Sequence, residues 1–249
     1  MNNKYSSPPI SVAMQCTVGS TAANKARAIL LVLAAGFSTQ QVFAAEATGK
    51  ADSVGAHPLA QANFEGERPS RDARQMADWI VQSGNSDGMP FVIVDKVDAK
   101  VFVFHADGRL NGATPALLGL ARGDDSVPGI GTRKLSSILP EERTTPAGRY
   151  VAARGRNIQG AEIIWVDYED AVSLHPVVTS NSKERRGQRL ATASPLDNRI
   201  SYGCINVPAK FYQGVVSPAF QNTSGVIYVL PETRPLQTVF PSFRPPARD

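Results

Sequence analysis

The chain has 249 residues, of which 42% are hydrophobic and 19% charged, and its formal net charge is +4. This length suffices for one sizeable domain with additional segments, and the composition argues against a wholly disordered chain. The positive charge by itself would suit a nucleic-acid partner, so its distribution along the chain matters.

The first 44 residues have the layout of a secretory signal peptide. They contain Lys4, Lys25 and Arg27 and no acidic residue, and the apolar run 28–37 follows. Residues 42–44 (VFA) then fit the small-residue pattern before a cleavage site. Ten apolar residues are too few to cross a bilayer, which takes about 20. We therefore expect cleavage after residue 44 and no stable membrane span. The alternative is that the apolar run is a buried helix of the mature fold. Met14 is a second candidate for the first residue of the translated chain.

The basic charge belongs mostly to this segment. Removing it takes three of the 26 basic residues and leaves the rest nearly balanced against the 22 acidic ones. Binding of phosphates needs clustered positive charge, so the sequence predicts an exported protein without a nucleic-acid partner.

Residues 45–89 are interpreted as a linker that carries one helix. Residues 45–69 are polar and small and have no period. Over 71–83 the apolar residues recur at helical spacing, which predicts an amphipathic helix with Ser70 and Gly84 as caps. The residues that set this spacing are Ala73, Met76, Ala77, Ile80 and Val81.

From Pro90 the apolar period becomes two, which is typical of strands. Strands are expected at 91–94, 100–104, from the Asp107-Gly108 turn towards Leu120, and at 149–154, 161–167, 171–174 and 225–230. The segments 122–148 and 176–199 are interpreted as long loops, and a short helix is expected after Cys204. Strands predominate, so we predict a mostly β domain over 90–231, a sandwich or barrel, followed by an extended Pro-rich tail over 232–249.

Cys204 is the only thiol expected in the mature chain, because Cys16 lies in the signal segment. A lone exported cysteine is a reactive thiol, an intermolecular link or a small buried apolar residue. Its surroundings, residues 200–208 (ISYGCINVP), favour the reactive thiol. A following helix and a nearby histidine would both lower its pKa. The N–H groups of Tyr202, Gly203 and Cys204 would form an oxyanion hole.

His175 is the expected base, by elimination among three histidines. His57 lies in the linker and His105 beside a turn, whereas His175 ends an apolar strand where a loop begins. A histidine at such a place is more often structural, and its pairing with a lone cysteine favours catalysis. The sequence has no His/Cys/Asp cluster with metal spacing and no phosphate loop after a strand, so neither a metal nor another cofactor is expected.

The residues around Cys204 resemble the L,D-transpeptidase catalytic domain family (YkuD-type). Its signature is a histidine, a spacer and then [S/T]-x-G-C-hydrophobic-[N/R], which Ser201, Gly203, Cys204, Ile205 and Asn206 match. Residues 91–108 look like its opening hairpin, and 145–150 (TPAGRY) look like its T-P-x-G-x-[FY] stretch. The resemblance extends from about residue 90 to residue 230.

The resemblance implies a β-sandwich or barrel-like fold and acyl transfer on peptidoglycan stem peptides, in the periplasm or at the cell wall. The Cys204 thiolate would attack the carbonyl of an L-centre and release the terminal D-alanine, and the thioester would pass to an amine or to water. His175 would take the thiol proton and return a proton to the leaving amine. Carbapenem-type inhibitors would acylate the same cysteine.

The resemblance also implies roles for neighbouring residues. The carbonyl of Pro176 would orient the imidazole, and Ser201 would position the cysteine loop. Asn206 would order this loop or contact substrate. Arg199 and Tyr150 are further candidates for substrate contact.

Two features depart from the family pattern. Tyr202 stands where many members have histidine, and 25 residues separate His175 from Ser201, a longer spacer than is common. An insertion around 180–198 would explain the length. Its four cations could make it a lid that attracts stem-peptide carboxylates, and the alternative is a solvated charged loop. These cations are Lys183, Arg185, Arg186 and Arg189.

Three functions remain open at this point. The first is an L,D-transpeptidase. The second is a hydrolase that uses the same thioester, either a carboxypeptidase or an enzyme that releases a protein from the wall. The third is a non-catalytic wall-binding domain, which would require His175 and Cys204 to lie apart.

Overall fold

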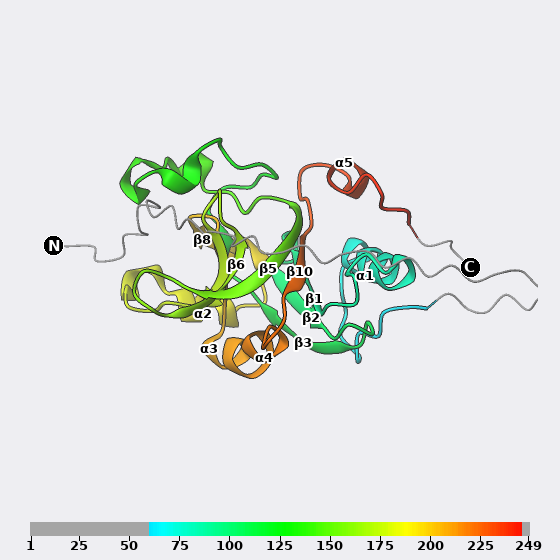
Figure 1. Cartoon of the computed structure of the whole chain (residues 1–249). Coiled ribbons are helices and arrows are strands. Elements are labelled where there is room, and N and C mark those ends of the chain that lie inside the picture. The colour runs from blue at the N-terminus through cyan, green and yellow to red at the C-terminus, as the bar shows by residue number, and fades with distance from the viewer. Residues whose placement is uncertain (1–59, 246–249) are drawn as a thin grey trace, which may run out of the picture. The chain divides into compact units, whose positions relative to one another are not determined.

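The computed structural model describes residues 60–245 of the chain (Figure 1). The expected signal peptide with Cys16, residues 45–59 of the expected linker with His57, and residues 246–249 lie outside the described residues. The strands are β1 (Phe91–Asp95), β2 (Lys100–Phe104), β3 (Leu110–Pro115), β4 (Leu118–Gly119), β5 (Gly148–Arg156), β6 (Glu162–Asp167), β7 (Val172–Pro176), β8 (Arg199–Ser201), β9 (Ile205–Val207) and β10 (Gly225–Val229). The helices are α1 (Arg71–Ser83), α2 (Arg186–Ala191), α3 (Ala209–Phe211), α4 (Ser217–Ala219) and α5 (Leu236–Val239), with a π-helical turn at Tyr212–Val216 between α3 and α4.

Eight strands form one sheet in the order β3-β2-β1-β10-β5-β6-β7-β9. The pairs β1/β10 and β7/β9 are parallel, and the other neighbours are antiparallel. Directly after β3, Leu117 forms an antiparallel bridge with Asn206 of β9. This bridge brings the two edges of the sheet together, so the sheet is a nearly closed barrel. The predicted mostly β, barrel-like class is confirmed.

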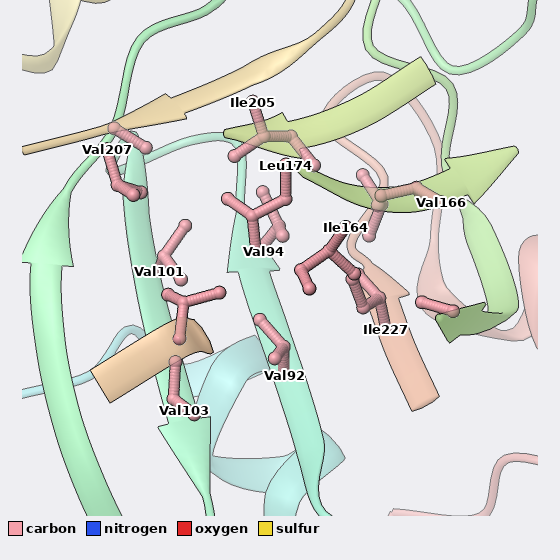
Figure 2. Packing of buried hydrophobic residues seen from close by; sticks show 14 of the residues in the cluster. Val92, Val94, Val101, Val103, Ile164, Val166, Leu174, Ile205, Val207 and Ile227 are labelled. Atoms are coloured by element: carbon pink, nitrogen blue, oxygen red, sulfur yellow. The ribbon is translucent and has the colours of Figure 1, made fainter. Parts of the chain in front are cut away.

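The barrel interior holds the first of two apolar clusters. Alternate residues of each strand point to the same side, so Val92 and Val94 of β1 face inward with Ile164 of β6 and Leu174 of β7. Figure 2 shows these aliphatic side chains meeting side chains from β9 and β10 between the strands. The inward side chains are mostly β-branched, the type that packs well on a pleated sheet.

A second apolar cluster covers the outer side of β1, β2 and β10, where the intervening residues are also apolar. Met76 and Ile80 of α1 pack against it and are fully buried. The Ser70 hydroxyl caps the start of α1 by accepting the Ala73 N–H at 3.1 Å, and Gly84 ends it in the left-handed conformation. Helix α1 therefore occupies the range that its apolar spacing predicts.

The segments on either side of the expected 90–231 domain differ from the expected linker and extended tail. Phe64 is only 4% exposed, and its ring meets those of Phe102 and Phe104 edge to face. In the tail, Phe243 is buried with its ring 5.7 Å from that of Trp79. The physical reason is that α1 covers only part of the apolar outer face, and each buried aromatic side chain contributes about 1.5–3 kcal/mol. Helix α1, the barrel and the described tail thus pack as one unit.

Among residues 60–245, no helix is long and apolar enough to cross a membrane.

Candidate active site

Cys204 lies between two strands that the sequence analysis missed, just after β8 and just before β9. The Ser201 hydroxyl donates to the Cys204 carbonyl at 2.6 Å and accepts the Gly203 N–H at 3.1 Å. Gly203 has φ 130°, and a Cβ added there would lie 2.7 Å from the Thr144 carbonyl oxygen. Only glycine fits this turn without strain, so the turn fixes where the sulfur lies.

Four polar side chains share the outward face of β7 and β9. Leu174 and Ile205 are partners in register, and both point into the barrel. Because side chains alternate along a strand, Ser173 and His175 point outward from β7, and Cys204 and Asn206 point outward beside them. The parallel pairing of β7 with β9 therefore brings together the two candidate catalytic residues, 29 positions apart in the chain.

His175 is anchored by the backbone of the next residue. Its Nδ1 lies 2.8 Å from the Pro176 carbonyl oxygen. A carbonyl can only accept, so this bond assigns the ring proton to Nδ1 and leaves the lone pair of the neutral ring on Nε2. The ring is thus arranged to accept a proton at Nε2, on the side away from Pro176.

The thiol of Cys204 is free and partly exposed. Its Sγ lies 3.5 Å from the Ser173 hydroxyl and 3.7 Å from the Ala171 carbonyl oxygen. Burial raises the thiol pKa, but the interaction with His175 and the hydrogen bonds from Ser173 outweigh it and lower the pKa to about 7. For His175, burial lowers the pKa, and the interaction with Cys204 exceeds this and raises it. Each group favours the charged form of the other, so thiolate is available near neutral pH.

Ser173 is a site residue that the sequence analysis missed. Its hydroxyl and its backbone N–H both contribute to the lowered thiol pKa, and its side chain is 5% exposed. The available signal was its position two residues before His175 on a predicted strand, which places both on the same face.

The short helix expected after Cys204 is present, but it begins later than the expected start just after Asn206. The three residues after Cys204 form β9, and the first helical residue is Ala209. Ile205 and Val207 are β-branched and fully buried in the barrel, which explains why this segment is extended. At about 3.3 Å per residue, the helix start lies too far from the sulfur for its dipole to lower the thiol pKa.

The expected oxyanion hole loses one of its three donors, because the Gly203 N–H is already bonded to Ser201. The N–H groups of Tyr202 and Cys204 remain candidates. The Tyr202 ring lies under the Arg143 guanidinium, 4.0 Å from it, and this contact anchors the ring.

Arg199 is not placed to bind substrate. Its guanidinium binds both carboxylate oxygens of Glu232, at 3.0 and 2.6 Å, and donates to the Lys96 carbonyl at 2.6 Å. The side chain is 12% exposed, so its charge is used inside the protein. A cation next to the cysteine motif can either contact substrate or form an internal ion pair, and the sequence does not distinguish these two uses.

Tyr150 lines a cavity of about 400 Å³ between β5 and β6, together with Trp165 and Tyr168. Its hydroxyl donates to the Pro146 carbonyl at 3.3 Å, and burial raises its pKa. Trp165 and Ser173 are partners in register, so the cavity borders the face that carries the thiol.

The segment 176–199 is not the irregular loop expected, since it holds α2 between 3-10 turns at Ser182–Glu184 and Pro195–Asn198. Leu190 is 8% exposed and attaches α2 to the protein. Of its cations, Arg186 reaches the site and donates to the Asn206 side-chain oxygen at 2.7 Å. Arg189 instead donates to the carbonyls of Glu184 and Asp197.

Within residues 60–245, no group of three or more His, Cys, Asp or Glu side chains could hold a metal ion. The fold and this site together define a barrel-like β protein with an outward-facing cysteine–histidine pair.

No protein-family model and no curated protein sequence matches the chain. Among solved structures it is similar to the catalytic domain of an L,D-transpeptidase from E. faecium, with 17% identity, a TM-score of 0.33, and 57% of this chain and 96% of that one covered. It is also similar to the helical cell shape determining protein Pgp2 from Campylobacter jejuni, with 17% identity, a TM-score of 0.38 and coverage of 59% and 49%. An L,D-transpeptidase from Mycobacterium smegmatis gives 16% identity, a TM-score of 0.34 and coverage of 56% and 58%. The chain thus spans about half or somewhat more of the latter two proteins, and its function is inferred from the site itself.

Proposed function

We propose that this protein is a cysteine acyltransferase of the L,D-transpeptidase type that acts on peptidoglycan stem peptides. The observation that carries the proposal is the pair on the outward face of β7 and β9. A partly exposed thiol with a pKa lowered to about 7 interacts with a histidine whose other nitrogen is anchored to the Pro176 carbonyl. A buried structural cysteine needs none of these features.

In the proposed reaction, His175 accepts the thiol proton at Nε2 and the Cys204 thiolate attacks the carbonyl carbon of the donor peptide. A C–S bond forms, and the N–H groups of Tyr202 and Cys204 are candidates to stabilise the oxyanion. The C–N bond then breaks, and the amine leaves with the proton from His175. An acceptor amine attacks the thioester, loses its proton to His175 and releases the thiolate, which restores the pair.

The cavity lined by Tyr150, Trp165 and Tyr168 supports a peptide substrate. Its volume, about 400 Å³, lies within the range of about 300–1,000 Å³ that small-molecule sites occupy. Asp167 also lines it and could meet an amine of a stem peptide, whereas the Arg149 guanidinium is already paired with Asp87 at 2.9 Å. Trp165 of its lining is the register partner of Ser173 on the neighbouring strand, so a donor bound there could extend towards the thiol.

Hydrolysis of the same thioester is the second candidate function. It shares the thiolate, the histidine and the acylation step with transfer, and differs only in that water rather than an amine attacks the thioester. The wall-binding domain is disfavoured, since it requires His175 and Cys204 to lie apart, whereas the pairing of β7 with β9 puts both on one outward face.

Acylation by a carbapenem, followed by intact mass, tests the proposal. The wild-type protein should gain one adduct, and Cys204→Ala should gain none. His175→Ala should react about 10²–10⁴-fold more slowly, the usual contribution of a general base. His105→Asn removes the other described histidine and serves as the matched control with an unchanged rate. A wild-type protein that gains no adduct would refute the proposal.

Two further measurements address the open parts of the proposal. Product analysis with stem peptides, in the presence and absence of an acceptor amine, separates transfer from hydrolysis. Export is proposed from the sequence of residues 1–44, and intact mass of the mature protein tests it: retention of the apolar run 28–37 would contradict cleavage.

A further inference from the structure

Arg186 brings a cation from the insertion to the candidate active site. Its Nη1 donates to the Asn206 Oδ1 at 2.7 Å, and its Nε donates to a Glu184 carboxylate oxygen at 2.5 Å. The Arg186 side chain is 15% exposed and Asn206 is 1% exposed. The contact is therefore held inside the protein, where hydrogen-bond geometry has large energetic consequences.

This contact fixes which way the Asn206 amide faces. An arginine side chain has only donors, so the atom that Asn206 turns towards Arg186 must be its oxygen. The amide nitrogen then faces the other way, 3.1 Å from the Cys204 carbonyl oxygen and 3.4 Å from His175 Nε2. Arg186, which can only donate, and the Cys204 carbonyl, which can only accept, therefore hold the amide from opposite sides, whereas the contact with His175 alone could be made with the amide reversed.

The orientation matters for the protonation state of His175. In the neutral ring, Nε2 has a lone pair and can accept from the Asn206 amide. In the protonated ring, Nε2–H would face a second donor, which is unfavourable. The charge of Arg186 acts in the same direction, with Glu184 partly offsetting it, whereas Cys204 favours the protonated ring.

We propose that Arg186 is a positioning residue that locks the Asn206 amide with its N–H towards His175 and so favours the neutral imidazole that can accept a proton. Its importance for catalysis rests on the proposed function, but the contact and its effect on the ring do not. The insertion then influences proton transfer at His175, through the contact of Arg186 with Asn206.

The test measures the titration of His175 by NMR, through its ring Cε1–H signal, in the full chain carrying Cys204→Ala. This background removes the coupled thiol and needs no enzymatic activity, so failure of the proposed function leaves the result interpretable. Arg186→Met should raise the His175 midpoint by about half a unit or more. Lys183→Gln, which removes an exposed cation from the same insertion, is the matched control and should leave the midpoint unchanged.

A double-mutant cycle with Asn206→Ala separates the amide orientation from the charge of Arg186. If the amide transmits the effect, Arg186→Met shifts the midpoint more in the Asn206 background than in the Asn206→Ala background. Equal shifts in both backgrounds would overturn the proposal, because only a through-space charge effect would remain. An unchanged midpoint in Arg186→Met would overturn it as well. If Asn206→Ala fails to fold, Asn206→Ser completes the cycle, since its shorter side chain cannot bridge Arg186 and His175.

Discussion

Removing the hydroxyl of Ser173 tests the electrostatics of the thiol most directly. In Ser173→Ala the sulfur keeps the backbone N–H of residue 173 and the interaction with His175, and it loses only the hydroxyl at 3.5 Å. Ser173 is 5% exposed, so water is not expected to replace the hydroxyl without rearrangement. The thiolate therefore loses one hydrogen bond and gains no new partner.

The expected size of the effect follows from this single bond. A hydrogen bond to a charged group contributes about 1.5–3 kcal/mol, and the length of this one favours the low end. One pKa unit corresponds to about 1.4 kcal/mol, so the Cys204 pKa should rise from about 7 to about 8. Because the wild-type pKa is depressed, the thiolate fraction falls most around neutral pH. Reactivity at pH 7 should drop about fivefold and should recover fully above about pH 9.

The assay is the rate of Cys204 alkylation by iodoacetamide between pH 5 and pH 10, followed by intact mass. The control is Ser217→Ala, which removes another partly buried hydroxyl, one that donates to Glu162. The reasoning is refuted if the Ser173→Ala profile superimposes on the wild-type profile, or if the variant is slower by the same factor at every pH.

Three further changes test the support of the site and the packing of the chain. Gly203→Ala should lower the free energy of unfolding in urea by about 1–3 kcal/mol, because it combines a positive φ with a Cβ against the Thr144 carbonyl. It should also slow acylation by a carbapenem, and an unchanged acylation rate would contradict the tight turn. Asp124→Asn removes the nearer of two carboxylates beside the fully buried Lys96, at 2.8 Å against 3.8 Å for Glu232, and should lower the free energy of thermal unfolding by up to about 3–5 kcal/mol. Adding Lys96→Met should restore part of this loss, and no recovery would argue against an unpaired charge as its cause. Phe64→Ala should cost about 3–5 kcal/mol in urea unfolding, and a loss below about 0.5 kcal/mol would show that this segment is only loosely attached.

The sequence predicts those parts of the fold that depend on local patterns. The spacing of Met76 and Ile80 defines α1, and the alternation in 91–104 defines β1 and β2. Residues 91–94 and 101–104 are moreover apolar without interruption, which indicates that both faces of these strands are apolar. This pattern does not reveal what covers the outer face. Phe64 and Phe243 stand in polar and Pro-rich stretches, so their burial follows only from the three-dimensional arrangement.

The candidate site was predictable to a similar extent. Cys204 and His175 could be found because a lone thiol beside glycine and a strand-end histidine are unusual in a sequence. Ser173, Arg186 and Glu232 could not be found in this way, because serine, arginine and glutamate are common and their roles come from pairing between distant segments. The helix after Cys204 starts later than expected for a related reason, since the buried β-branched residues Ile205 and Val207 extend the chain before Pro208.

The position of the thiol also depends on a buried network of charges at the end of β1. Lys96 is fully buried and donates to Asp124 at 2.8 Å and to the Thr145 carbonyl at 2.9 Å. The Thr145 hydroxyl in turn donates to the Gly203 carbonyl at 2.8 Å. Glu232 lies in the segment expected to be an extended tail, and its side chain is fully buried beside Lys96. Since an unpaired buried charge is costly, these groups must assemble together. The threonine of the 145–150 stretch is thereby held against the glycine that precedes the nucleophile, which gives a physical reason for a threonine at that place.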